Sequence, residues 1–549
     1  MPGFRANPPA DRSRITGVSD EEQETRNPGR ATRFGLGALI GLLAGFAALA
    51  VAELAAAGVR PQAGPVTAVG GAAIDRAPIA VKDWAIRTFG TDDKLVLQLG
   101  ILAVLALFAL ALGVLAPRHR RAAAAGVLLF GVVGAAAATT RPDSTSFTDS
   151  LPSAVGGVAG AVLLYVLAGR LPEPDAAPAA PRHPGQGWDR RGFVIAATAA
   201  AAASAGAGVL GRVLNGGGDR DAVASRDNLR LPPAASPAPA VPGRAQVRVA
   251  GVSSFITPND DFYRVDTALV VPQVDATAWR LRIHGTGVRR PVTLSFDDLL
   301  RRKLIERDIT LTCVSNEVGG PYAGNARWIG VRLADLLADC GVVPPSRGGP
   351  ADQLVARSVD GMTIGSPVED VMDGRDALLA VGMNGEPLPF DHGFPVRMVV
   401  PGLYGYVSAC KWIEDIELTT FDAYDSYWVK RDWAREAPVK TQSRIDTPKP
   451  FARPKTGTVM VAGVAWAQHR GVDRVEIRVD EGPWQDATLA AEDSRDTWRQ
   501  WSYAWQATKG GHTLTVRATD RTGETQTEKR TRTVPDGASG WHSVVVTVE

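Results

Sequence analysis

Near the middle of the chain stands the segment Leu311-Thr312-Cys313-Val314-Ser315-Asn316. The residues that lead into it, Asp308–Thr312, are strand-like, so Cys313 is expected where a strand ends and a glycine-rich turn follows. A thiol at such a position is available to a ligand. By contrast, Cys340 follows a predicted helix and reads as a small buried hydrophobe, as free cysteines usually are.

Strands and short helices alternate irregularly on both sides of this segment, from Val247 to Leu418. Trp279–Gly285 alternates as a half-buried strand, Ser295 is expected to cap a helix over Ser295–Leu300, and Val331–Leu337 has helical spacing. The mixture favours an α+β fold over a doubly wound sheet. Neither GxGxxG nor GxxxxGK[ST] occurs, so no nucleotide cofactor is expected.

The C-terminal part, Lys455–Glu549, has regular short strands separated by Gly/Asp turns. The predicted strands are Val459–Trp466, Val475–Asp480 and Thr513–Ala518. This spacing is typical of an immunoglobulin-like β-sandwich. Five tryptophans are expected to fill its core: Trp466, Trp484, Trp498, Trp501 and Trp505.

The N-terminal part is dominated by Ala, Leu, Gly and Val and predicts an all-α transmembrane bundle. About 20 apolar residues cross a membrane. Five segments approach or exceed that length: Phe34–Gly58, Leu95–Ala116, Ala122–Thr139, Leu151–Gly169 and Phe193–Leu214. Arginines in the tail, in Pro117–Arg121 and in Arg170–Arg191 place these loops inside, which puts the C-terminal half outside the cytoplasm. The chain is therefore predicted to be a multi-pass protein of the cell membrane with an extracytoplasmic soluble half.

The last apolar segment has a second feature. Asp189-Arg190-Arg191-Gly192-Phe193-Val194-Ile195 resembles a twin-arginine export signal, which carries proteins that fold around a cofactor before export. An ordinary positively charged flank of a membrane helix is the alternative. Residues 215–244, rich in Gly, Pro, Ala and Asp, are expected to form a semi-flexible tether.

Length and composition bound the remaining possibilities. A chain of 549 residues is too long to fold around a single hydrophobic core, so more than one domain is expected. The expected organisation is a cytoplasmic tail at 1–32, a membrane domain at 33–214, the linker at 215–244, an α+β domain at 245–425 and the sandwich at 426–549. Three cysteines outside any CxxC pattern predict no disulfide framework, zinc site or c-type haem. The net charge of +2, without a basic block, gives no reason to expect nucleic acid as a partner. His119 and His183, the only histidines before residue 245, lie in loops, so no haem b is expected.

The order of segments from Phe255 to Glu549 resembles the sulfite oxidase family of molybdenum enzymes, including its C-terminal dimerisation domain. Four local matches carry the resemblance. They are Phe262-Tyr263-Arg264; Leu311–Asn316 followed by Gly324–Trp328; Met383-Asn384-Gly385-Glu386-Pro387-Leu388-Pro389 continuing through Asp391-His392-Gly393-Phe394-Pro395-Val396-Arg397; and Lys411-Trp412.

The resemblance implies a molybdopterin cofactor whose molybdenum is bound by Cys313, because a thiolate suits a metal that needs one further soft ligand. It implies that Arg397, His392 and Lys411 donate to the cofactor's phosphate tail and that Asp360 accepts from the pterin ring. The cofactor-binding residues implied in full are Phe262, Tyr263, Arg264, Cys313, Asn316, Asp360, His392, Arg397 and Lys411. The catalytic residues implied are Cys313, Arg264 and Trp433.

Several residues depart from the family pattern. Glu317 and Val318 stand where two arginines are usual, Trp433 replaces a tyrosine, and Asp266 replaces a histidine. These changes remove positive charge, so we expect a small dianion to bind less well. The leading hypothesis is oxygen-atom transfer on a small sulfur-containing substrate. The alternatives are a reductase of sulfoxides such as methionine sulfoxide, and a cofactor-free, membrane-tethered binding protein.

The resemblance also bears on partners. No cytochrome b5 segment precedes the implied molybdenum domain, so a separate electron carrier is expected. The C-terminal domain, by its likeness to the family's dimerisation domain, implies a homodimer.

Overall fold

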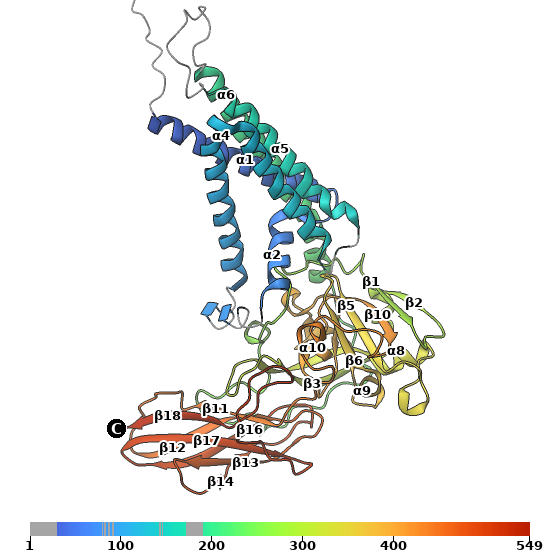
Figure 1. Ribbon diagram of the computed structural model, residues 1–549. Helices are drawn as coiled ribbons and strands as arrows, with labels where there is room; N and C mark the ends of the chain where they lie inside the picture. The colour runs from blue at the N-terminus through green and yellow to red at the C-terminus, as the bar shows by residue number, and fades with distance from the viewer. Residues whose placement is uncertain are drawn as a thin grey trace, which may run out of the picture.

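The computed structural model describes residues 30–78, 81, 84–85, 88–89, 93–141, 144, 146–171 and 190–549. Three parts follow one another along the chain: a bundle of long helices, an α+β domain and a pair of C-terminal sheets (Figure 1). The predicted tail up to residue 29 and Asp189 of the twin-arginine-like segment lie outside the described residues.

Four helices among the described residues are long and apolar enough to cross a membrane. They are α1 (Arg30–Ala57), α4 (Asp93–Thr139), α5 (Leu151–Ala168) and α6 (Arg190–Asp227). Helix α4 is broken at His119, where φ is −135° and ψ is 59°, two residues after Pro117. The ring centroids of Phe108 and Phe130, on either side of this break, are 4.9 Å apart, so α4 folds back on itself. Its two arms are the second and third apolar segments of the sequence, and together the four helices contain all five.

The loop between α1 and α4 has more structure than its mixed charges indicate. It contains η1 (Pro61–Ala63) and α2 (Pro65–Arg76), which has Pro65 in its first turn, where proline's fixed φ suits a helix. Arg60, just before it, donates to both carboxylate oxygens of Asp149 at 2.9 and 2.6 Å. Asp149 belongs to η3 (Phe147–Ser150), which leads into α5, so the loop is held against the bundle.

The linker is not the semi-flexible tether that its composition predicts. Helix α6 continues to Asp227. Further on, the backbone N–H of Ala235 donates to the Leu304 carbonyl at 2.8 Å, and the N–H of Glu306 donates to the Ser236 carbonyl at 2.9 Å. Backbone pairing with β3 (Leu304–Thr312) satisfies polar groups of residues 235–236 and fixes the path of the chain there, which composition alone does not reveal.

The α+β domain is built on two sheets. The first has the order β2 (Val292–Ser295), β1 (Arg280–Gly285), β10 (Ile413–Thr419), β5 (Gln353–Ser358), β6 (Thr363–Pro367). The second has the order β3 (Leu304–Thr312), β4 (Ala323–Arg332), β7 (Leu378–Met383), β8 (Glu386–Pro387), with β9 (Arg397–Val399) also on β7. Only β1 and β10 pair in parallel among these named strands, as suits an α+β domain.

Short helices lie before, between and after these strands. They are η4 (Asn259–Asp261), α7 (Phe296–Leu300), α8 (Leu333–Asp339), η5 (Pro345–Arg347), α9 (Val368–Met372), η6 (Phe390–His392), α10 (Gly405–Ser408) and η7 (Val429–Arg431). Ser295 caps α7 in a capping box with Asp298, which confirms the predicted helix start. The predicted helix at Val331–Leu337 begins later, because Val331 and Arg332 still pair with β7 as the end of β4.

The C-terminal sheets enclose a second core. One has the order β11 (Gln442–Thr447), β12 (Gly457–Trp466), β16 (Arg499–Ala507), β15 (Thr488–Leu489), and the other β14 (Gln485–Asp486), β13 (Val472–Val479), β17 (Gly510–Asp520), β18 (His542–Val548). Trp501 and Trp505 lie in this core as predicted. The expectation for the other three tryptophans was wrong: Trp466 and Trp498 pack into the α+β core, and Trp484 meets Trp541 edge-on at a half-buried surface.

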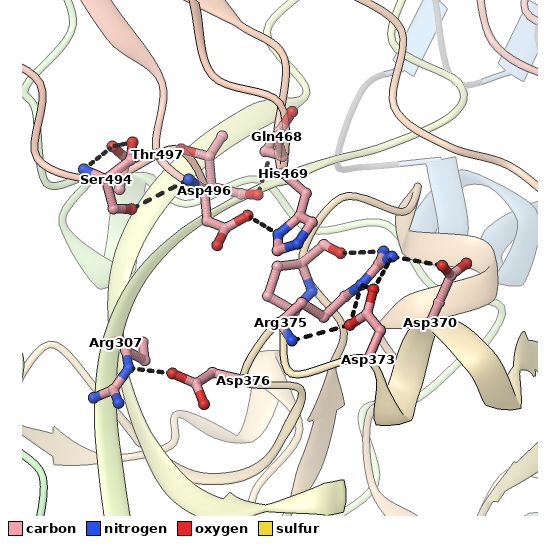
Figure 2. A network of polar contacts seen from close by, with 12 residues as sticks. Arg307, Asp370, Asp373, Arg375, Asp376, Gln468, His469, Ser494, Asp496 and Thr497 are labelled. Atoms are coloured by element: carbon pink, nitrogen blue, oxygen red, sulfur yellow. Dashed lines mark hydrogen bonds and ion pairs between the residues drawn. The ribbon is translucent and has the colours of Figure 1, made fainter. Parts of the chain in front are cut away.

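The sandwich holds strand β3 of the α+β domain. Gln468 donates to the Thr310 carbonyl at 3.0 Å and to the Thr312 hydroxyl at 2.9 Å, and the Thr310 N–H donates to the Asp496 carbonyl at 2.9 Å. His469 pairs with the Asp496 carboxylate at 3.0 Å in the same network (Figure 2). Because β3 ends at Thr312, these contacts fix the position from which Cys313 projects.

Candidate functional site

A cavity in the α+β domain gathers most of the residues singled out from the sequence. Eight of the ten residues with implied roles line it: Phe262, Tyr263, Cys313, Asp360, His392, Arg397, Lys411 and Trp433. They come from the loop after η4, the end of β3, the β5–β6 turn, η6, β9 and the loops around β10. The cavity therefore forms only when distant parts of the chain fold together.

Cys313 enters the cavity directly after β3 on a closed loop. Its backbone N–H donates to the Tyr322 carbonyl at 2.9 Å, and the side-chain oxygen of Asn316 accepts from the Tyr322 N–H at 2.9 Å. Burial raises the pKa of the Cys313 thiol, while hydrogen bonds from Ser315 act in the opposite direction. The loop thus presents a fixed sulfur, and Asn316 positions the loop without itself lining the cavity.

An aromatic group forms one wall. Phe262 stacks on Tyr263 with ring centroids 5.2 Å apart and meets His392 edge-on at 5.5 Å. Burial raises the pKa of the Tyr263 hydroxyl above its ordinary value, so it remains protonated at neutral pH. A protonated phenol next to Cys313 can donate a hydrogen bond to a ligand in the cavity.

Arg397 is the most deeply buried cation of the site. Only 5% of the residue is exposed, its Nη1 donates to the His392 carbonyl at 3.1 Å, and its carbon Cζ lies 4.9 Å above the Trp328 ring. Its Nε has no hydrogen-bond partner. Burial lowers the pKa of the guanidinium to about 10, which leaves it charged at neutral pH. A buried, charged donor without an acceptor is costly, so this site favours an anionic or carbonyl-bearing ligand.

His392 differs from the charge-assisted donor that the sequence predicts. Burial and then the Arg397 charge lower the pKa of the ring to about 4, so it is neutral at pH 7. Its Nε2 lies 2.9 Å from the Asn259 carbonyl, which can only accept, so this nitrogen carries the hydrogen. His392 therefore leaves Nδ1 as an acceptor.

Asp266 and Lys411 form a buried ion pair in the cavity. Lys411 Nζ donates to Asp266 Oδ2 at 2.7 Å and to the Asp391 carbonyl at 3.1 Å. The other oxygen of Asp266, Oδ1, accepts from Lys94 at the start of α4. Burial alone would raise the pKa of Asp266, but Lys411 and Lys94 hold it at about 2. The carboxylate is thus ionised and shared by two cations.

The remaining wall is aromatic and acidic. The Trp433 ring lies 5.6 Å from Tyr406 and 6.2 Å from Trp428, and the Trp433 indole N–H has no hydrogen-bond partner. Asp360 lies in the β5–β6 turn, where its carboxylate accepts from the Met362 N–H at 3.3 Å. Burial raises the pKa of Asp360, which favours its protonated form relative to an exposed aspartate.

Arg264 does not line the cavity, although the sequence gives it both a catalytic and a cofactor-binding role. Its Nη1 lies 3.1 Å from Asp391 Oδ2 in a partly exposed ion pair. Several residues without an assigned role do line it, among them Trp428, Tyr406 and Cys410. The position of Trp428, shortly before the Arg431-Asp432 pair, is a sequence signal that could have identified it as a cavity residue. For Lys94 the sequence indicates only a charged residue that flanks an apolar helix.

Comparison with known proteins places this cavity in a recognisable domain. Residues 268–428 match the family model described as "Oxidoreductase molybdopterin binding domain". The mitochondrial sulfite oxidase of Rattus norvegicus is 32% identical over 289 residues, covering 45% of this chain and 52% of that protein. The sulfite oxidase of Gallus gallus is 32% identical over 297 residues, covering 46% of this chain and 63% of that protein.

More distant similarities extend to other enzymes. A nitrate reductase [NADH] of Oryza sativa subsp. japonica is 33% identical over 201 residues, covering 32% of this chain and 21% of that protein. A solved structure, the sulfane dehydrogenase SoxCD from Paracoccus pantotrophus, matches with a TM-score of 0.46 and 24% identity, covering 55% of this chain and 85% of that one. The chain spans about half the length of the first curated relatives that it matches.

Proposed function

We propose that this chain, whose residues 268–428 form a molybdopterin-binding oxidoreductase domain of the sulfite oxidase family, transfers an oxygen atom to or from a small sulfur-containing substrate. One observation carries the proposal: the Cys313 thiol shares a single cavity with Arg397 and Lys411. A soft metal ligand and two buried cations in one cavity suit a molybdenum cofactor with an anionic tail.

The donors present in the cavity fit that cofactor. Cys313 would bind the metal, the unpartnered Nε of Arg397 would donate to an anionic or carbonyl oxygen, and Lys411 would add a second cation. When bound, molybdopterin supplies a molybdenum centre that exchanges an oxygen atom and two electrons with the substrate. The chain holds the ligand in place and excludes bulk water with the walls around Phe262 and Trp433.

The helical region, in this proposal, anchors the enzyme in the cell membrane with the catalytic domain outside the cytoplasm. The four long apolar helices support the anchor, and the arginine-rich segments support the orientation. The twin-arginine-like segment at the start of α6 would export a domain already loaded with cofactor. Electrons would pass to or from a separate carrier, and two copies would pair through the sandwich.

A second candidate substrate is a sulfoxide such as methionine sulfoxide. Trp433 packs with Tyr406 and Trp428 into an aromatic wall, and the side chain of Met362 also lines the cavity. An apolar wall suits the alkyl groups of a sulfoxide better than it suits a small dianion. Two assays on the purified enzyme separate the candidates. One measures oxidation of sulfite with an artificial electron acceptor, and the other measures reduction of methionine sulfoxide with an artificial electron donor.

The cofactor assignment is tested by metal and pterin analysis of the full chain. Wild type from molybdate-fed cells should contain about one molybdenum and one pterin per chain. Cys313→Ser should lose at least nine-tenths of the activity. X-ray absorption of the molybdenum that remains in this variant should show altered sulfur ligation. Cys340→Ser is the matched control, since Cys340 is also buried but lies at the end of α8, away from the cavity.

Two results would end this proposal. One is wild-type protein without molybdenum, and the other is a Cys313→Ser variant with unchanged activity and metal ligation. Cys410→Ser adds a further check, because Cys410 lines the same cavity. If sulfur ligation is lost in Cys410→Ser but kept in Cys313→Ser, the metal ligand is Cys410 and our assignment of Cys313 is wrong.

A further inference from the structure

Among the described residues of the helical region, Lys94 contacts an acidic side chain that lines the cavity. Lys94 lies at the start of α4, and its ammonium contacts Asp266 Oδ1, while Lys411 contacts Oδ2 of the same carboxylate. Only 2% of the Asp266 side chain is exposed. The helical region therefore supplies one of the three charges in a buried cluster that borders the cavity.

Other contacts dock the same region beside the cavity. The Tyr427 hydroxyl donates to Asp75 of α2 at 2.5 Å, and Arg431 donates to the Asp75 carbonyl at 3.3 Å. Leu269 packs so closely on Gly70 that a Cβ on this glycine would lie 2.5 Å from the leucine side chain. In Figure 1, α2 lies between the bundle and the α+β domain, as these contacts require. These contacts hold α2 against the α+β domain, and the Lys94–Asp266 contact joins the start of α4 to the same domain.

The charges of the cluster do not cancel. Within this cluster one carboxylate, that of Asp266, contacts two ammonium groups, those of Lys94 and Lys411, so these three groups sum to one positive charge. Lys411 uses two of its three ammonium hydrogens on Asp266 and the Asp391 carbonyl. The same ammonium also lies 4.5 Å from the centre of the Trp412 ring, and both Lys411 and Trp412 line the cavity.

We propose that Lys94 is a positioning residue of this site: by neutralising Asp266 it leaves the Lys411 ammonium as a net cation for an oxyanion bound in the cavity. The oxyanion is either an anionic substrate or the phosphate of the cofactor. This inference rests on the proposed function and deepens it. The helical region then anchors the enzyme and also contributes a side chain that supports the binding site.

The test compares Lys94→Gln, which keeps a hydrogen-bond donor without the charge, with Lys94→Arg, which keeps the charge. Lys303→Gln is the matched control, since Lys303 is an exposed lysine of the α+β domain. All are full chains purified in detergent. Three quantities are measured: molybdenum and pterin content, KM and kcat for sulfite, and the rise in Tm caused by millimolar sulfate at constant ionic strength, which requires no turnover.

We expect Lys94→Gln to raise the KM for sulfite about tenfold with kcat changed less than about threefold, and to lose most of the sulfate-induced rise in Tm. Lys94→Arg should recover both. If Lys94→Gln instead loses pterin while its circular dichroism is unchanged, the oxyanion is the cofactor's phosphate, which also supports the inference.

Three results would overturn it. One is Lys94→Gln matching wild type in sulfite KM, pterin content and sulfate protection. The second is Lys94→Arg being as impaired as Lys94→Gln, because charge would then not be the determinant. The third is impairment shared by Lys303→Gln. Wild type without molybdenum would refute the proposed function instead, and the sulfate measurement would still decide the role of Lys94.

Discussion

At the scale of single residues, Asp266 shows how a side chain's effect depends on its partners. From the sequence, an acidic residue in place of a histidine predicts a less positive pocket. In the structure Asp266 lies between Lys94 and Lys411, so the group has a net positive charge. The expected weakening of dianion binding at this position therefore loses its basis, although the substitutions at Glu317 and Val318 remain.

The Asp266 cluster should also be important for stability. Asp266→Asn leaves two lysines, whose side chains are 18% and 10% exposed, without their shared counterion. Removing one partner of a buried ion pair costs about 3–5 kcal/mol, which predicts a decrease in Tm on the order of 10 °C. Thermal unfolding of the purified full chain measures it.

The control for this prediction is Asp391→Asn, which breaks the ion pair with Arg264. The Asp391 side chain is 48% exposed, so this pair should be worth at most about 1 kcal/mol. Similar Tm values for the two variants would contradict the buried-pair argument.

The residues of the cavity differ in how far the sequence could reveal them. Cys313, Arg397 and Lys411 stand in or beside ordered local motifs, and all three line the cavity. Lys94 is 172 residues from Asp266, and nothing near it in the chain indicates that partner. Arg264 matched a motif but faces Asp391, because a motif gives a position in the chain and not the direction of a side chain.

At the scale of elements, small residues determine how the long helices pack. Gly37 and Gly41 of α1 face Gly113 of α4 so closely that a Cβ on Gly113 would lie 2.2 Å from the Gly37 carbonyl oxygen. Close approach of backbones through glycine is a common way for helices to associate in a membrane. The glycines within these apolar segments are therefore what lets α1 and α4 pack closely.

This packing predicts different effects for two glycines of the same helix. Gly113→Leu should force α1 and α4 apart and destabilise the bundle by about 1–3 kcal/mol, the usual cost of overpacking. Gly100→Leu, where nothing lies within 4 Å of an added Cβ, should be tolerated. The Tm and the yield of monodisperse protein in detergent measure the difference. Equal behaviour of the two variants would mean that α1 and α4 do not meet at Gly113.

Elements were predicted well where a periodic or apolar pattern extends over many residues. The five apolar segments, the strand at Trp279–Gly285 and the cap at Ser295 appear as expected. Helix α2 was missed because its short sequence, with two adjacent glycines, has no strong amphipathic pattern. The ordered path of residues 235–236 was missed because its partner, β3, is distant in sequence.

At the scale of the whole molecule, the sandwich and the α+β domain meet around the Cys313 loop. Arg444 donates to the Gly320 carbonyl at 2.8 Å, and a Cβ on Gly319 would lie 2.2 Å from the His542 ring. His542 Nδ1 accepts from the Ile445 N–H at 3.0 Å, which requires this nitrogen to be unprotonated. The sandwich therefore supports the loop that presents the thiol, and His542 makes that support sensitive to acid.

This arrangement predicts the direction of a pH dependence. Burial and then the Arg444 charge lower the pKa of His542 from 6.5 to about 4. A lowered folded-state pKa contributes stability that is complete above pH 6.5 and is lost as the pH falls toward 4, about 2 kcal/mol of it by pH 5. His542→Asn keeps an acceptor for Ile445 but does not titrate, so its Tm should fall less than that of wild type between pH 7 and pH 5. His512→Asn is the matched control: Asp480 raises the pKa of His512, so its removal should leave the acid loss unchanged or enlarge it. An acid-induced fall in Tm that is the same in wild type and His542→Asn would show that the junction between the two domains does not titrate through this histidine.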